Sequence, residues 1–353
     1  MAIPPIRNKK LTRILSIDGG GIRGILPGQV LVALEQKIRH KTGNDEAKIA
    51  NYFDFFAGTS TGGILSCALN MPAEEDPTKP RYSAEDAVKL YLENGGKIFD
   101  IPTWHKLRTA DGVLEEKYPQ DAIEEILEKY FGETKLSELL HPCLISSYDV
   151  KRGKPHFFTQ HKARELAKDG NHGYDFLVRD VARATSAAPT YFEAANIESL
   201  SGVNYPLVDG GVFANNPTLC AYSSARQVKF EEEKDLPSAG EMLIFSLGTG
   251  SSDKSYEFER VAKWGMVEWI KPIIEIMMDG VSKTVDYQLY QIFDAVGRPD
   301  QYVRINPVLG DASSEMDRAD EENLLHLKAA GTETAEKYDW ELDQLADQLI
   351  END

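Results

Sequence analysis

The 353-residue chain is long enough for one large α/β domain or two modest ones, and its 42% hydrophobic and 27% charged residues are typical of ordered globular proteins. Its formal charge of −18 argues against bulk binding of nucleic acid, which needs a basic surface, and weakens purely electrostatic docking to anionic membranes. Three scattered cysteines, no secretory signal and no apolar stretch near the roughly 20 residues that span a bilayer predict a soluble, cytoplasmic protein.

The first elements in chain order are a strand, a glycine-rich loop and a helix. Residues 14–17 are a short β-rich run, and residues 18–24 (DGGGIRG) form the loop. Apolar residues then recur at helical spacing over 26–40, and Gly43 is a suitable stop. The same plan is repeated by a strand over 52–58 that turns into a helix.

The next predicted elements alternate in the same way. A helix begins at Ser83 and ends near Phe99, and further elements follow: a helix over 120–131, a strand pair over 142–160, a helix in 178–192 that ends near Pro189, and strands over 205–211 and 242–250. Apolar strands that alternate with helices predict an α/β fold, with three layers (α/β/α) around a mainly parallel central sheet.

Beyond residue 250 the pattern changes, so we divide the chain into a core over 11–250 and a helical C-terminal extension over 251–353 that packs on the core or is contiguous with it. Apolar residues recur at spacings of three or four over 261–281, with Pro272 expected to interrupt the helix. This apolar segment is consistent with a lid, a contact in a homo-oligomer, a membrane-facing surface or a helix packed in the core.

The glycine loop offers several backbone amides without side chains to obstruct them, just before a helix. Such a loop stabilises an anion, either a phosphate or the oxyanion of acyl transfer. Gly19, Gly21 and Gly24 also match the dinucleotide pattern G-x-G-x-x-G, although no acidic ribose partner follows at the expected distance. A purely structural turn is the other interpretation.

Residues 57–63 read AGTSTGG, and Ser60 lies between Gly58 and Gly62 in the spacing of a nucleophile elbow. A small-residue turn, where a helix packs closely on a sheet, would give the same letters. The glycine loop upstream favours the elbow, because acyl transfer needs both a nucleophile and an oxyanion-binding loop.

The general base is harder to identify, because none of the seven histidines has a suitable context. His326 is the only one that follows the last core strand, and it falls in a predicted helix. Asp209 is the better candidate: it ends an apolar strand and precedes Gly210 and Gly211, although an ordinary Asp-Gly turn would look the same. An aspartate with an ordinary pKa is a weak base, so burial beside Ser60 would have to raise its pKa.

Taken in order, DGGGIRG, GTSTG and DGG resemble the motifs of the patatin-like phospholipase family, over about residues 11–250. The resemblance implies a patatin-like fold and a Ser–Asp dyad, with Ser60 as nucleophile and Asp209 as general base. It further implies an oxyanion hole of amides around Gly20, Gly21 and Ile22, supported by Arg23. The implied activity is hydrolysis of fatty-acyl esters of phospholipids or lysophospholipids at a membrane surface, with no cofactor or metal.

Two other functions stay open: an esterase or thioesterase on other acyl substrates, and a non-catalytic nucleotide-binding module that uses the glycine loop. A short patatin-like chain of this kind is also similar to bacterial antiphage effectors, so a cyclic nucleotide is a candidate activator. No nucleotide-binding motif accompanies that resemblance.

Overall fold

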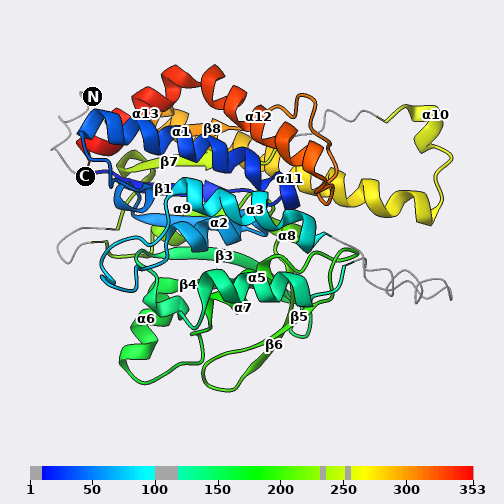
Figure 1. The fold of residues 1–353 in the computed structure, drawn as a ribbon, viewed down its shortest axis with the longest axis horizontal. Helices are drawn as coiled ribbons and strands as arrows, with labels where there is room; N and C mark the ends of the chain where they lie inside the picture. The colour runs from blue at the N-terminus through cyan, green and yellow to red at the C-terminus, as the bar shows by residue number, and fades with distance from the viewer. Residues whose placement is uncertain (1–9, 100–117, 231–235, 251–255, 353) are drawn as a thin grey trace.

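A computed structural model describes residues 10–99, 118–230, 236–250 and 256–352 of the protein. Its central sheet has eight strands: β1 (Thr12–Ile17), β2 (Phe55–Thr59), β3 (Cys143–Asp149), β4 (Lys154–Thr159), β5 (Ala195–Glu198), β6 (Asn204–Asp209), β7 (Met242–Leu247) and β8 (Tyr302–Ile305). They are arranged in the order β5-β6-β3-β2-β1-β7-β8, and β4 also pairs with β3 (Figure 1). The strands β3, β2, β1, β7 and β8 are parallel, so the predicted α/β fold with a mainly parallel sheet is confirmed.

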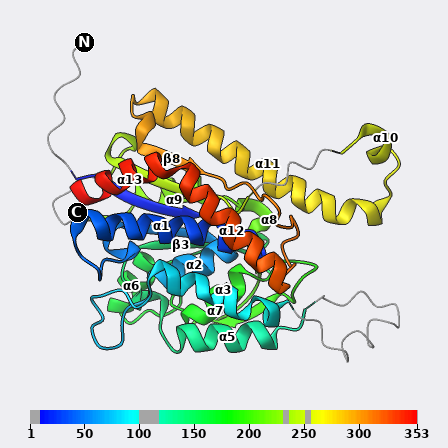
Figure 2. The same ribbon diagram turned by 45° about the horizontal axis from the view of Figure 1, so that its top comes forward.

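Helices cover both faces of this sheet. The described α-helices are α1 (Ile25–Thr42), α2 (Thr61–Leu69), α3 (Ala84–Ile98), α5 (Asp121–Phe131), α6 (Gln160–Lys168), α7 (Val178–Thr185), α8 (Gly211–Ala214), α9 (Thr218–Ala225), α10 (Phe258–Val261), α11 (Met266–Ala295), α12 (Glu321–Lys337) and α13 (Asp339–Glu351). Figures 1 and 2 show α1, α12 and α13 packed side by side along one face.

Alternation along the strands explains why both faces are buried. On β2, Phe56 packs into the larger core cluster with α1, α2, α3 and α7, whereas Phe55 and Ala57 pack into a second cluster with α9 and α11. Strand β1 divides in the same way between Leu15 on one face and Ile14 on the other. The continuous apolar runs of these strands follow from this three-layer packing.

One edge of β3 is shared by two strands that approach it from opposite directions. Strand β4 pairs with β3 from Leu144 to Asp149 and therefore occupies one edge of β3 throughout. Since a strand has two edges, β2 and β6 must both lie on the other. Strand β2 runs parallel to β3 up to Ser146, and antiparallel β6 begins its pairing at the next residue, Ser147. The carboxyl ends of β2 and β6 thus meet beside the middle of β3.

Most of the predicted elements are confirmed, and four details differ. The helix expected to begin at residue 178 and end near Pro189 is shorter, since α7 ends at Thr185. Pro272 does not interrupt α11, which continues through it from Met266 to Ala295. The short strands β5 and β8 were not predicted from the sequence.

The region after residue 250 contributes to the sheet as well as to its covering. Strand β8 pairs in parallel with β7, and α12 and α13 pack on α1. The extension is therefore not helical throughout, and the division at residue 250 stays a prediction. None of the helices in the described parts of the chain is long and apolar enough to cross a membrane.

Helix α11 has two different halves. Its C-terminal half packs on the sheet through Val285, Leu289 and Phe293. Its N-terminal half extends away from the body of the molecule towards α10 (Figures 1 and 2), and Ile273, Ile276 and Met277 are about half exposed there. The side chains of residues 266, 267, 270 and 271 lie outside the described part of the chain.

Candidate active site

Ser60 occupies a sharp turn between β2 and α2. Its backbone has φ 54° and ψ −123°, a conformation that is unusual for a residue other than glycine and typical of a nucleophile elbow. The flanking glycines make the turn sterically feasible. A β-carbon on Gly58 would lie 2.2 Å from the carbonyl oxygen of Gly62, and one on Gly62 would lie 2.1 Å from that of Ile17. The letters of AGTSTGG therefore correspond to a sharp strand-to-helix turn of the kind that a nucleophile elbow requires.

The segment that follows α7 holds the elbow and the aspartate strand together. The Ser60 amide donates to Thr185 Oγ1 at 2.9 Å, and the Thr185 hydroxyl donates to the Ser146 carbonyl at 2.6 Å. Two residues later, the Ala187 carbonyl accepts the amide of Asp209 at 2.9 Å. One short stretch of backbone thus fixes the positions of Ser60 and Asp209 relative to each other.

Asp209 is buried, with 5% of its surface exposed, and the Ser60 hydroxyl lies near enough to its carboxylate to lower the pKa of that group by hydrogen bonding. The Gly211 amide donates to Asp209 Oδ1 over 2.7 Å. Burial raises the pKa of Asp209 to about 6, and the hydrogen bonds from Ser60 and Gly211 offset part of that rise. A carboxylate with this pKa is ionised at neutral pH and is a stronger base than an ordinary aspartate.

The glycine loop brings two amides to the site. Gly20 and Gly21 line the same pocket as Ser60 and Asp209, and their amides have no acceptor among the described residues. The Ile22 amide, by contrast, donates to the Met316 carbonyl at 2.8 Å. The expectation that Ile22 contributes an oxyanion donor is therefore wrong, because a distant loop of the chain already accepts its hydrogen bond.

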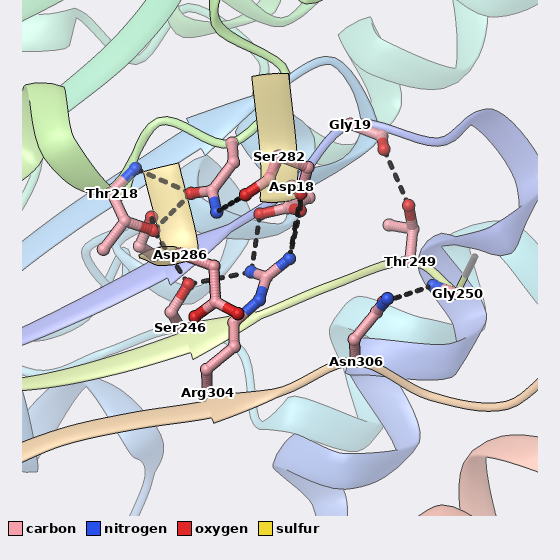
Figure 3. Close-up of polar contacts among 12 residues, drawn as sticks. Asp18, Gly19, Thr218, Ser246, Thr249, Gly250, Ser282, Asp286, Arg304 and Asn306 are labelled. Carbon is pink, nitrogen blue, oxygen red and sulfur yellow. Dashed lines mark hydrogen bonds and ion pairs between the residues drawn. The ribbon is translucent and has the colours of Figure 1, made fainter. Parts of the chain in front are cut away.

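A buried ion pair anchors the start of this loop to strand β8. Arg304 donates to both carboxylate oxygens of Asp18, at 2.9 and 2.6 Å, and Ser282 of α11 donates to Asp18 at 2.7 Å (Figure 3). Both charged side chains are almost fully buried. Each needs the other as a partner, because an unpaired charge in the protein interior is strongly destabilising. The first residue of DGGGIRG is thus held by two elements from the C-terminal region.

Further contacts tie the loop to the end of β7. Thr249 donates to the Gly19 carbonyl at 2.7 Å, and the neighbouring Gly250 amide donates to Asn306 at 3.1 Å (Figure 3). Arg23 donates to the carbonyls of Gly20 and Gly250, both at 3.3 Å, and so links the two turns. The remaining motif glycines, Gly24 and Gly210, lie where a β-carbon would collide with Thr61 or Ser146.

Ser60 and Asp209 both line an apolar pocket of about 200 Å³. Its walls come from α3, α5, the segment after α7, and α11, with side chains that include Ile98, Ile123, Phe192, Ile274 and Met278. No described histidine lines this pocket, and His105 lies outside the described residues. Within the described part of the chain, no group of three or more His, Cys, Asp or Glu side chains is arranged to hold a metal ion.

The sequence profile of the patatin-like phospholipase family matches residues 15–222, a range that contains the loop, the elbow and the aspartate. This chain belongs to that family. Full-length similarity agrees: "Patatin-like protein 1" of Arabidopsis thaliana is 35% identical over 91% of this chain and 80% of its own, and "Patatin-T5" of Solanum tuberosum is 34% identical over 93% and 84%.

"Probable inactive patatin-3-Kuras 1" of Solanum tuberosum is 34% identical over 93% of this chain and 87% of its own length. Among solved structures, VipD from Legionella pneumophila aligns with a TM-score of 0.40 and 10% identity, over 95% of this chain and 67% of that one, which is too distant to inform the site. As a member of the patatin-like family, the chain is related to lipid acyl hydrolases.

Sequence reasoning placed the motifs of this patatin-like chain but missed the residues that orient them. Thr185 stands in the ARATSAAPTYF stretch that was part of the resemblance, so a signal existed for it. Arg304 and Met316 lie far outside the motifs and near no distinctive pattern. Only the pairing of β8 with β7, and the path of the loop before α12, bring them to the glycine loop.

Proposed function

We propose that the protein is a serine acyl hydrolase of the phospholipase A or lysophospholipase type that acts through a Ser60–Asp209 dyad. The observation that carries the proposal is the placement of Ser60 next to the buried Asp209 carboxylate, where both residues line one apolar pocket. A nucleophile and its base in contact, beside two free loop amides, are the parts that acyl transfer requires.

In the acylation step, Asp209 takes the hydroxyl proton of Ser60 as the Ser60 oxygen attacks the ester carbonyl carbon. The amides of Gly20 and Gly21 stabilise the negative charge that develops on the carbonyl oxygen. The bond to the leaving alcohol then breaks, and Asp209 gives its proton to that alcohol. The acyl group remains on Ser60 as an ester until water releases it as the fatty acid.

The shape and chemistry of the pocket favour a fatty-acyl substrate. An acyl chain would lie against the apolar walls formed by Ile98, Ile123 and Phe192. Binding would be favourable because it removes the methylene groups of the chain from water. The neighbouring half of α11 places Ile274 and Met278 in the pocket, while Ile273 and Ile276 are each 45% exposed. We propose that this exposed face contacts the lipid surface during catalysis.

The direct test is release of fatty acid from mixed phospholipid vesicles. Wild-type protein should release fatty acid, Ser60→Ala should not, and Asp209→Asn should retain at most a small fraction of the wild-type activity. His326→Ala is the matched control for a histidine-dependent mechanism and should behave as wild type. Full hydrolysis by Ser60→Ala would exclude the dyad. Because one relative carries a name that marks it as probably inactive, this assay decides whether the arrangement is catalytically competent here.

The two other functions predict different outcomes in the same experiment. A general esterase or thioesterase would hydrolyse short activated esters or acyl thioesters but leave phospholipid vesicles intact. A nucleotide-binding module would bind ATP or NAD without hydrolysis and would be unaffected by Ser60→Ala. The apolar walls of the pocket above Gly20 and Gly21 favour an acyl chain over a charged nucleotide.

Activation by a cyclic oligonucleotide, with a role in antiphage defence, stays a prediction. No feature of the described residues adds support to it, and the relatives named above come from plants. The hydrolysis assay repeated with a panel of cyclic dinucleotides and trinucleotides tests it, and equal activity with and without them would contradict it. Association into a homo-oligomer also stays a prediction.

A further inference from the structure

Asn215, which directly follows α8, has a buried polar atom without a partner. Its side chain is 6% exposed, and its Oδ1 accepts no hydrogen bond from any described residue. A buried carbonyl oxygen left in this state costs free energy, so such atoms in folded proteins normally meet water or a ligand. The Asn215 backbone is well fixed, since its carbonyl accepts the Gly19 amide at 3.0 Å.

The unpartnered oxygen lies beside both members of the dyad. A β-carbon built on Gly19 would be 2.5 Å from Asn215 Oδ1 and 3.3 Å from Ser60 Cβ. One built on Gly211 would be 3.1 Å from Asp209 Oδ1 and 3.4 Å from Asn215 Oδ1. Asn215 Oδ1 therefore borders the space next to the Ser60 and Asp209 side chains, and both glycines are needed to keep that space open.

Asn215 also lines a second, polar cavity of about 60 Å³ behind the glycine loop. Polar side chains surround it, among them Asp18, Thr249 and Ser282, which Figure 3 shows around the loop. The cavity shares Met278 and Met316 with the apolar pocket, so the two spaces are neighbours. A buried water needs only about 10–15 Å³ and two or more polar partners, and this cavity satisfies both conditions.

We propose that Asn215 binds the hydrolytic water and that the polar cavity supplies it while an acyl chain fills the apolar pocket. This inference rests on the proposed function, because it concerns the acyl-Ser60 intermediate. Asp209 and Asn215 each offer an acceptor oxygen, and a water has two hydrogens to donate. When both are donated, a lone pair of the water oxygen is left to point at the acyl carbon.

In the deacylation step, the water oxygen forms a bond to the acyl carbon, and Asp209 takes one proton of that water. The tetrahedral intermediate then loses its bond to the Ser60 oxygen, which takes the proton back from Asp209. The products are the free fatty acid and the Ser60 hydroxyl, so no other reactant is needed. Asn215 holds the second hydrogen of the water and does not change its own protonation state.

The test compares water with methanol as the acyl acceptor in Asn215→Leu, which keeps the branched side-chain shape but removes the acceptor. Methanol has one hydroxyl hydrogen, and Asp209 alone accepts it, so Asn215 should matter for water and much less for methanol. Acyl-Ser60 is formed with an activated ester, and its decay is followed by mass spectrometry with and without methanol. Asn196→Leu, at an exposed asparagine of β5, is the control.

We expect hydrolysis of acyl-Ser60 to slow about tenfold in Asn215→Leu, the loss of roughly one neutral hydrogen bond in the transition state. The ratio of methyl ester to free fatty acid should rise by a similar factor. Asn215→Asp, which keeps an acceptor oxygen, should keep the ratio near the wild-type value. Because the ratio is measured within one sample, it does not depend on the fraction of protein that is folded.

Two outcomes overturn different claims. If wild-type protein never forms acyl-Ser60, the proposed function is wrong. If acyl-Ser60 forms but decays at the same rate in Asn215→Leu, or if methanol and water transfer slow equally, then Asn215 does not bind the hydrolytic water.

Discussion

Thr59 and Asp209 pair with consecutive residues on the same edge of β3: Thr59 lies opposite Ser146, and Asp209 lies opposite Ser147. Strand β2 runs towards this point from one direction and β6 from the other. The residue after Thr59 is Ser60, so the two strand ends deliver the nucleophile and its base to one place. Thr59 reinforces the junction, since its hydroxyl lies 2.6 Å from that of Ser146.

The buried position of Asp209 predicts the acid limb of the pH profile. Only the ionised carboxylate accepts the Ser60 proton, and its pKa is raised to about 6 by burial, against the opposing hydrogen bonds from Ser60 and Gly211. We expect kcat/KM to fall about tenfold per pH unit below that value and to be nearly constant just above it. Rates measured from pH 4.5 to 8 check this; an acid limb near pH 4 would mean that Asp209 titrates as an exposed aspartate.

The same shift predicts that Asp209→Asn stabilises the fold at neutral and alkaline pH. The folded-state pKa of about 6 exceeds the unfolded value, so ionisation of Asp209 costs stability as the pH rises through 6. Below about pH 4 the group is protonated in both states, and the cost disappears. We expect a gain on the order of 3 kcal/mol in the free energy of unfolding at pH 8 and little at pH 4.

Denaturant titrations at the two pH values measure this difference. Asp311→Asn, at an exposed carboxylate of the loop before α12, is the control and should change little at either pH. An equal effect of Asp209→Asn at both pH values would contradict the linkage to ionisation.

Two helical glycines should respond to alanine with opposite signs. Alanine normally stabilises a helix interior by about 1 kcal/mol relative to glycine, and Gly280 in α11 has nothing within 4 Å of a new β-carbon. Gly62 in α2 has the Ile17 carbonyl oxygen at 2.1 Å, so Gly62→Ala must displace the elbow. We expect Gly62→Ala to lose about 2–4 kcal/mol and most activity, and Gly280→Ala to gain stability. Equal melting temperatures for the two variants would show that the elbow tolerates a β-carbon.

Replacement of Arg304 should destabilise the protein at the glycine loop, although Arg304 is far from that loop in sequence. Arg304→Met leaves the buried Asp18 carboxylate without its ion pair, which costs about 3–5 kcal/mol. Asp18→Asn in the same chain should restore much of that loss, because it removes the unpaired charge. Arg318→Met is the matched control: it breaks an exposed pair with Asp320 and should cost under about 1 kcal/mol.

Melting curves of the single and double variants separate these outcomes. If Arg304→Met alone were as stable as wild type, the ion pair would not anchor the loop. A lower turnover in the stable double variant would show that the pair also sets the position of Gly20 and Gly21.

The sequence by itself determined the local parts of this protein. The elbow around Ser60, the glycine loop and the Asp-Gly-Gly turn depend on residues within a few positions of one another, because glycine spacing directly limits which turns the backbone can make. The alternation of buried strands and amphipathic helices could also be predicted from the sequence, because each element has its own pattern of apolar residues. These local patterns, taken in order, were sufficient for the family.

Only the tertiary structure decided how these parts meet. Three contacts join residues that are far apart in the chain. Strands β2 and β6 meet on one edge of β3, Arg304 pairs with Asp18, and the Ile22 amide donates a hydrogen bond to the Met316 carbonyl. Such contacts leave no periodic signal, because they depend on strand register and on the path of distant loops. The elevated pKa of Asp209 and the unpartnered oxygen of Asn215 follow from the same packing. Both depend on burial, which is set by the tertiary fold and not by the residues that are adjacent in sequence.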